Sequence, residues 1–255
     1  RPGPVLVDIT KDAQMELMYF SYEKCTSVRS YKPVPQTSEK SLADAALLIN
    51  QAKKPYIIWG QGVILGEAEK EFQDFIEKTG IPAASTILGL SALDTDHPNY
   101  VGMVGMHGNY GPNVLTNECD VLIAVGMRFD DRVTGRLSDY AKQAKVIHFE
   151  IDPAEVDKNV KADVAVMGNV KHTLAQMMDL VDASEHSEWR ALFDTYLEKE
   201  VDEVIDAQIN PTKPGLTMGE VLDLINKSSE EKAVIVSDVG QHQMWAAQYL
   251  RRMEP

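Results

Sequence analysis

The stretch that decides the fold is VLIAVGMRFDDRVTG, residues 121–135, in which an apolar run ends at a glycine and two arginines and two aspartates follow. Five consecutive apolar residues at 121–125 are typical of a strand that is buried on both faces. Such strands occur in parallel sheets that helices cover on both sides. We therefore expect the charged loop at the carboxyl edge of a parallel sheet, where α/β proteins bind their ligands.

Predicted strands and predicted helices alternate on either side of this stretch. Short apolar runs predict strands, and apolar residues at three- and four-residue spacing predict helices. The expected strands lie at 55–59, 81–85, 146–150 and 163–167, and the expected helices at 41–53, 68–78 and 170–180. This alternation predicts an α/β fold, a parallel sheet flanked by helices.

The chain divides into four sections by its pattern. Residues 33–182 hold the predicted α/β domain, which opens with the polar stretch PVPQTSEK. Residues 1–32 contain a strand-like VLVDI at 5–9 and precede it. Residues 183–214 predict a connecting helix, which the prolines at 211 and 214 end. Residues 215–255 resemble the start of a second α/β domain, with a helix from Thr217 and a strand at 233–236. The first residue is not Met and both ends fall within such units, so we expect an internal piece of a longer protein.

Composition excludes several classes of function. The net charge is −14, which argues against a nucleic-acid partner because phosphate binding needs clustered Lys and Arg. The two cysteines, Cys25 and Cys119, have neither metal-binding nor disulfide spacing, so we expect no metal site in this chain. No apolar run approaches the ~20 residues that span a bilayer, and the N-terminus does not resemble a targeting signal. These features predict a cytoplasmic protein of bacterial type that does not bind membranes.

The segment WGQGVILG, residues 59–66, has glycines between a predicted strand and a predicted helix. Glycine lets the backbone approach a ligand closely and direct N–H groups at a phosphate. The spacing departs from G-x-G-x-x-G by one residue. A tight structural turn and a cofactor loop are equal alternatives for Gly60 and Gly62.

Two further strand ends carry charge. The loop at 126–135 is either a salt-bridged surface turn or a site where arginine contacts phosphate or carboxylate, and its position favours the second. After the strand at 146–150, Glu150 and Asp152 could accept hydrogen bonds from ribose hydroxyls. Asp152 precedes Pro153 and could equally cap a helix.

Residues 102–111, GMVGMHGNYG, contain four glycines and two methionines. This composition predicts a loop, because glycine weakens the interior of a helix or a strand. His107 stands without a nucleophile beside it, and a lone histidine is more often structural than catalytic. Met103 and Met106 offer adaptable apolar surface that suits a flat ring.

Together these segments resemble the acetohydroxyacid synthase (acetolactate synthase) family, which belongs to the thiamine-diphosphate-dependent enzymes. The resemblance covers essentially the whole chain and is carried by GPVLVDITKDAQ (3–14), GMHGNYGPN (105–113), GMRFDDRVTG (126–135) and DVGQHQMWAAQ (238–248). It implies a three-domain subunit. Residues 1–32 would end the pyrimidine-binding domain, 33–182 would form the DHS-like NAD/FAD-binding middle domain, and 215–255 would begin the diphosphate-binding domain.

The resemblance implies that FAD lies across the carboxyl ends of the middle-domain strands. The positions that match flavin contacts are Arg29, Gly60, Gly62, Thr86, Ile87, Leu88, Gly105, His107, Gly126, Arg128, Asp130, Arg132, Val133, Glu150, Ile151, Asp152, Glu155, Gly168, Asn169 and Val170. Asn169 stands where the family commonly has an acid. The family's reaction is not a redox one, so FAD is structural there.

The implied reaction is decarboxylation of pyruvate on thiamine diphosphate, then transfer of the two-carbon unit to pyruvate or 2-oxobutyrate. Arg132 resembles the residue that holds the carboxylate of the second 2-oxo acid. Met106, Asp131 and Arg132 resemble residues that line the inhibitor channel, and Gly240, Gln241 and His242 resemble the start of the thiamine diphosphate site. The family also implies Mg²⁺, a homodimer or tetramer and a regulatory small subunit.

Two elements of the family's active site do not occur in this sequence. They are the cofactor-activating Glu of the first domain and the Mg²⁺ motif of the third, so we expect the chain alone to be inactive. Two other readings stay open, a stand-alone flavin- or nucleotide-binding module and a pyruvate oxidase-like thiamine-diphosphate flavoenzyme. A sirtuin-like deacetylase would usually need a four-cysteine zinc site, which two cysteines exclude.

Overall fold

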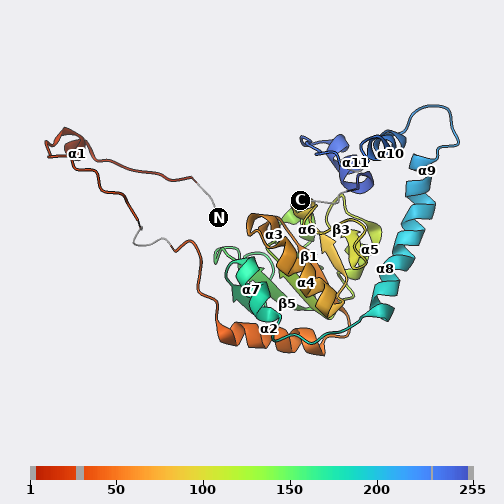
Figure 1. The fold of residues 1–255 in the computed structure, drawn as a ribbon, viewed down its shortest axis with the longest axis horizontal. Coiled ribbons are helices and arrows are strands. Elements are labelled where there is room, and N and C mark those ends of the chain that lie inside the picture. The colour runs from red at the N-terminus through yellow and green to blue at the C-terminus, as the bar shows by residue number, and fades with distance from the viewer. Residues whose placement is uncertain (1–3, 27–31, 231, 252–255) are drawn as a thin grey trace.

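The computed structural model describes residues 4–26, 32–230 and 232–251. At its centre lies a parallel sheet of six strands in the order β3-β2-β1-β4-β5-β6 (Figure 1). The strands are β1 Pro55–Trp59, β2 Ala83–Ser85, β3 Tyr100–Met103, β4 Val121–Val125, β5 Lys145–Glu150 and β6 Val164–Met167. The order reverses between β1 and β4, the point at which doubly wound sheets open a crevice for ligands. The predicted α/β fold is confirmed.

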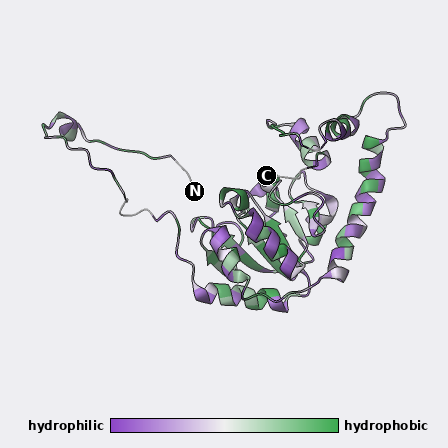
Figure 2. Ribbon diagram, in the orientation of Figure 1, coloured by the Kyte–Doolittle hydropathy of each residue, from purple (hydrophilic) through white to green (hydrophobic). Residues whose placement is uncertain are grey.

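Helices cover both faces of the sheet, as the uninterrupted apolar strands require. Successive side chains of β1 point to opposite faces, so Ile57 and Trp59 enter one hydrophobic cluster and Tyr56 and Ile58 enter the other. The helices on the Trp59 face are α2 Glu39–Gln51, α3 Gly62–Leu65, α4 Glu69–Thr79 and α7 Val170–Met177, and those on the Tyr56 face are α5 Tyr110–Leu115 and α8 Ser187–Glu200. Figure 2 shows the hydrophobic residues gathered in the strands and hydrophilic residues on the outer faces of the helices.

The register of the central strands brings their last residues level with one another. Trp59 of β1 pairs with Val125 of β4, and Val125 pairs with Phe149 of β5. The three loops that follow these strands therefore begin side by side at the carboxyl edge. Trp59 anchors this edge, because its buried indole Nε1 donates to the Gly89 carbonyl oxygen at 2.7 Å.

Two predicted strands are absent from the described residues. Residues 5–9 form no strand, and the next element is a short helix, α1 Lys11–Met15. Residues 233–236 also form no strand, and Val234 and Val236 are each 91% exposed. A strand needs a neighbour for its backbone N–H and C=O groups, and neither segment pairs with a strand of the described chain. Residues 4–26 instead extend away from the sheet (Figure 1).

The prediction of a loop across residues 102–111 was partly wrong. Gly102 and Met103 belong to β3, and Tyr110 and Gly111 begin α5. Pairing with β2 outweighs the low strand propensity of glycine, and Gly102 adopts a φ of +112°, which glycine tolerates at an edge strand. The stretch at 62–65, expected to be part of a loop, forms the short helix α3.

The remaining elements follow the sheet. The connecting helix α8 continues as a π-helical turn at Val201–Ile205 and as α9 Asp206–Ile209. Thr217 and Glu220 then form a capping box at the start of α10 Met218–Ser228, as the sequence predicts for a helix from Thr217. The last element is α11 Gln241–Tyr249. Across the described ranges, we find no helix with the length and apolar character to cross a membrane.

The two cysteines differ in burial, which predicts different reactivity. Burial raises the pKa of the Cys119 thiol to about 12, and its Sγ lies 3.2 Å from the Thr116 carbonyl oxygen, to which it donates. Cys25 is exposed. Because the thiolate is the reactive form, iodoacetamide near pH 8 should modify Cys25 and leave Cys119 unmodified until the chain is unfolded in urea. Peptide mass spectrometry checks this, and equal modification of both residues in the native chain would contradict the burial of Cys119.

Candidate functional site

The residues predicted to contact a cofactor lie at one edge of the sheet. They follow the carboxyl ends of the six parallel strands, as in dinucleotide-binding folds. The set is Gly60 and Gly62 after β1, Thr86, Ile87 and Leu88 after β2, Gly105 and His107 after β3, Gly126, Arg128, Asp130, Arg132 and Val133 after β4, Glu150 at the end of β5 with Ile151, Asp152 and Glu155 after it, and Gly168, Asn169 and Val170 after β6. Arg29 lies outside the described residues.

At the centre of this edge, the loops after β1 and β4 pack backbone against backbone. The Gly62 N–H donates to the Gly126 carbonyl oxygen at 2.8 Å, and the Gly60 N–H donates to the Val125 carbonyl oxygen at 3.0 Å. A Cβ added at Gly62 would lie 2.6 Å from the Gly126 Cα. These two glycine N–H groups are therefore engaged within the protein, which favours the structural alternative for them. Glycine is needed here because the loops approach too closely for any side chain.

The charged loop after β4 contains the ion pair that the first alternative predicted. Asp130 caps the short helix α6 Asp131–Thr134, since its Oδ1 accepts the Arg132 N–H at 3.1 Å. Its Oδ2 accepts from Arg128 Nη2 at 3.2 Å. This ion pair is partly exposed and stabilises the fold little. The Arg128 and Arg132 side chains are exposed at the ligand-binding edge, a placement that suits contact with an anion.

The structure brings Met106 next to Arg132. The Met106 N–H donates to the Arg132 carbonyl oxygen at 2.7 Å, and the Arg132 Nη1 lies 4.0 Å from the Met106 sulfur. Both side chains are exposed, as is that of Asp131 on the same short helix. The three residues predicted to line one channel therefore come from two neighbouring loops.

At the end of β5, the Glu150 carboxylate is buried and organises the turn that follows. Its Oε1 accepts the N–H groups of Ile151 at 2.9 Å and Asp152 at 3.0 Å. Its Oε2 lies 3.6 Å from Nε2 of the fully buried His148, which is also 3.0 Å from the Met127 carbonyl oxygen. His148 could not be recognised from the sequence, because a histidine inside an apolar strand does not reveal what its ring contacts.

Asp152 does not cap a helix, so that alternative was wrong. A turn follows it, in which the Asp152 Oδ1 accepts the Ala154 N–H at 3.0 Å. Asn169 does cap a helix, because its Oδ1 accepts the Lys171 N–H at 2.9 Å at the start of α7. An aspartate would cap this helix equally well.

The predicted thiamine diphosphate residues lie at the start of α11. Gly240 precedes the helix, and Gln241 and His242 form its exposed first turn. The other end of α11 contacts the loop after β3, since Gln248 Nε2 donates to the His107 carbonyl oxygen at 3.2 Å. The helix α11 thus contacts the loop that carries Met106.

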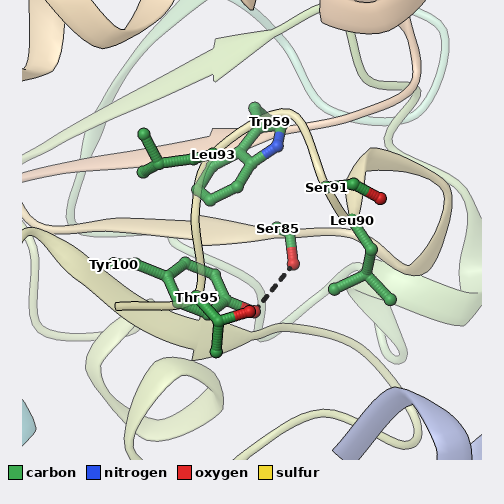
Figure 3. A pocket seen from close by; sticks show the side chains of 7 residues that line it. All are labelled: Trp59, Ser85, Leu90, Ser91, Leu93, Thr95 and Tyr100. Atoms are coloured by element: carbon green, nitrogen blue, oxygen red, sulfur yellow. Dashed lines mark hydrogen bonds between the residues drawn. The ribbon is translucent and has the colours of Figure 1, made fainter. Parts of the chain in front are cut away.

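Two hollows in the described part of the chain lie away from the charged loops. The first lies beside the carboxyl ends of β1 and β2 and is too small to hold a water molecule, far below the ~300 Å³ of a typical small-molecule site. Figure 3 shows its lining residues, Trp59, Ser85, Leu90, Ser91, Leu93, Thr95 and Tyr100, with Ser85 Oγ and the Tyr100 hydroxyl 3.4 Å apart. The second, larger hollow is open to solvent at the opposite, amino edge, where Gly80, Asn99 and His186 line it. In the described ranges, no three His, Cys, Asp or Glu side chains cluster as metal ligands.

Comparison with known proteins identifies the domain. The family "Thiamine pyrophosphate enzyme, central domain" matches residues 42–177, which is more than half of the chain. Over its whole length the chain is 38% identical to acetolactate synthase of Mycobacterium bovis and 36% identical to the probable acetolactate synthase large subunit of Methanocaldococcus jannaschii, and it covers 42% and 44% of these proteins. Over 97% of its length it is 38% identical to the acetolactate synthase isozyme 1 large subunit of Escherichia coli, of which it covers 42%.

The chain thus spans about two fifths of the length of these curated relatives. The matched range includes all six strands and the loops at their carboxyl ends up to α7. The chain therefore belongs to the thiamine pyrophosphate enzyme family, whose central domain it contains.

Proposed function

We propose that this chain is a section of an acetolactate synthase large subunit. The observation that carries the proposal is the 38% identity to proteins of that name, which extends over the entire chain and not only over the central domain. Residues 1–32 are then the end of the pyrimidine-binding domain, 33–182 the central domain, 183–214 the connecting helix and 215–255 the beginning of the diphosphate-binding domain.

The carboxyl edge of the sheet suits FAD in its chemistry. The exposed guanidinium group of Arg128 can contact a pyrophosphate, and the half-buried Asp152 side chain can accept hydrogen bonds from hydroxyl groups. The Glu155 side chain is buried and its Oε1 accepts from Lys158 Nζ at 3.1 Å, so it is less accessible to a cofactor. Met106 offers an apolar, adaptable surface to a ring. Glu150 fits less well, because one of its oxygens already accepts two backbone N–H groups. We assign Glu150 to shaping the turn that presents Asp152.

The proposed reaction joins two molecules of pyruvate, or pyruvate and 2-oxobutyrate, with loss of CO₂. Thiamine diphosphate, held with Mg²⁺ by the complete enzyme, supplies the nucleophile that carries the two-carbon unit. The Arg132 guanidinium holds the carboxylate of the second 2-oxo acid by paired charge-assisted hydrogen bonds. Gly240, Gln241 and His242 begin the site for the diphosphate. The product enters branched-chain amino-acid biosynthesis, and a dimeric or tetrameric enzyme in the cytoplasm works with a regulatory small subunit.

We expect the 255-residue chain alone to form no acetolactate. The groups that activate thiamine diphosphate and hold Mg²⁺ must surround the reacting atoms, and this sequence contains neither motif. The test supplies the purified chain with pyruvate, FAD, thiamine diphosphate and Mg²⁺ and measures acetolactate. The large subunit that carries this sequence is the positive control. Turnover by the chain alone would refute the proposal that catalysis needs the activating glutamate and the Mg²⁺ motif, which this sequence does not contain.

A further inference from the structure

We propose that Asn113 is a positioning residue that fixes the backbone of Met106 against Arg132. This inference rests on the proposed function, in which Arg132 holds the substrate carboxylate. The Asn113 side chain projects from α5 into the loop after β3. It acts on Arg132 through Gly105 and Met106.

The first step is a two-point clamp on Gly105. The Asn113 Oδ1 accepts the Gly105 N–H at 2.9 Å, and the Asn113 Nδ2 donates to the Gly105 carbonyl oxygen at 3.0 Å. One amide side chain thus satisfies both backbone polar groups of a single residue. A carboxylate could make only the first of these bonds, and an aliphatic side chain could make neither.

The second step links the clamped glycine to Arg132. Gly105 has a φ of +110°, and a Cβ there would lie 2.8 Å from the Arg132 carbonyl oxygen. The two loops therefore meet at this glycine. The next residue, Met106, donates its N–H to the same oxygen at 2.7 Å.

Arg132 is consequently held by its backbone from two sides. Met106 binds its carbonyl oxygen, and Asp130 Oδ1 accepts its N–H at 3.1 Å. The Arg132 guanidinium itself is exposed. These backbone contacts therefore fix the point from which the Arg132 side chain extends.

The helix that carries Asn113 is fixed in turn by α8. Glu200 Oε2 accepts the Tyr110 N–H at 3.1 Å and the Asn109 Nδ2–H at 3.3 Å. The rings of Tyr110 and Tyr196 meet edge to face with centroids 5.3 Å apart. The clamp therefore has a rigid base, which a positioning residue requires.

Amide hydrogen exchange of the 255-residue chain tests the clamp without reference to catalysis. Asn113→Ala should speed exchange of the Gly105 and Met106 N–H groups by about tenfold, and Asn113→Asp, which keeps the acceptor, should slow Gly105 exchange again in part. Asn117→Ala is the matched control. Asn117 follows the same helix, and its Oδ1 accepts the Ala141 N–H at 2.7 Å instead. Unchanged exchange at Gly105 and Met106 in Asn113→Ala would overturn the proposal.

Kinetics of the large subunit that carries this sequence test the consequence. Asn113→Ala should raise KM for pyruvate by about tenfold and change kcat less than threefold, because a displaced guanidinium weakens binding of the carboxylate. Asn117→Ala should leave KM unchanged. Faster exchange together with an unchanged KM in an active enzyme would overturn the positioning role. A wild-type subunit without synthase activity would instead refute the proposed function. In that case hydrogen exchange at Gly105 and Met106 would still show whether Asn113 holds this loop.

Discussion

Replacing Arg132 with alanine in the large subunit that carries this sequence is expected to lower kcat/KM for pyruvate by about a hundredfold. Loss of one partner of a charge pair held by hydrogen bonds typically costs about 2–5 kcal/mol, and a hundredfold loss corresponds to about 2.7 kcal/mol. Steady-state acetolactate formation measures the change. Arg132→Lys should recover only part of it, because an ammonium group cannot make the paired contacts of a guanidinium.

Arg136→Ala is the matched control for this prediction. Arg136 follows the same short helix, is exposed, and pairs with Asp139 at 3.3 Å. Its removal takes the same charge from the same loop but should leave kcat/KM within about twofold of wild type. Equal losses in the two variants would mean that the local positive charge, and not contact by Arg132, supports turnover.

Gly126→Ala is expected to destabilise the central domain by about 3 kcal/mol. Gly126 has a φ of +57°, which costs a residue with a side chain about 1–2 kcal/mol. The added Cβ would also lie 2.7 Å from the Gly62 Cα, and overpacking of this kind costs about 1–3 kcal/mol more. The free energy of unfolding from urea titration measures the sum.

Gly135→Ala separates these two contributions. Gly135 has a φ of +56° and a ψ of −123°, and a Cβ there would meet no atom within 4 Å. This variant should therefore lose only the free energy of backbone strain, about 1–3 kcal/mol. If Gly126→Ala cost less free energy than Gly135→Ala, the predicted clash of its Cβ with the loop after β1 would be refuted.

The sequence predicted the strands at the centre of the sheet because their signal is local. The expected strands at 55–59 and 121–125 match β1 and β4 residue for residue. It did not predict β3, because Gly102 and its neighbours form a strand only through pairing with β2. It predicted strands at 5–9 and 233–236 that the structure lacks. Apolar alternation indicates which segments can form a strand, whereas hydrogen-bonded partners determine which do.

For the candidate site, the sequence predicted positions along the chain but not the contacts between loops. The position of the charged loop at the carboxyl edge followed from the strand before it. The distribution of hydrogen bonds did not follow, because it depends on contacts across the sheet. Gly62 donates to the loop after β4 and Glu150 accepts from its own turn, so atoms that sequence alone offers to a cofactor are engaged within the protein. The Asn113 clamp on Gly105 joins residues eight positions apart and carries no motif of its own.

Under the proposed function, the large subunit that carries this sequence makes acetolactate without net redox chemistry. The most direct test supplies pyruvate and inorganic phosphate to the large subunit that carries this sequence and identifies the product while the flavin spectrum is followed. We expect one acetolactate and one CO₂ for every two pyruvates, with the flavin remaining oxidised. Formation of acetyl phosphate with reduction of the flavin, or an absence of acetolactate, would contradict it.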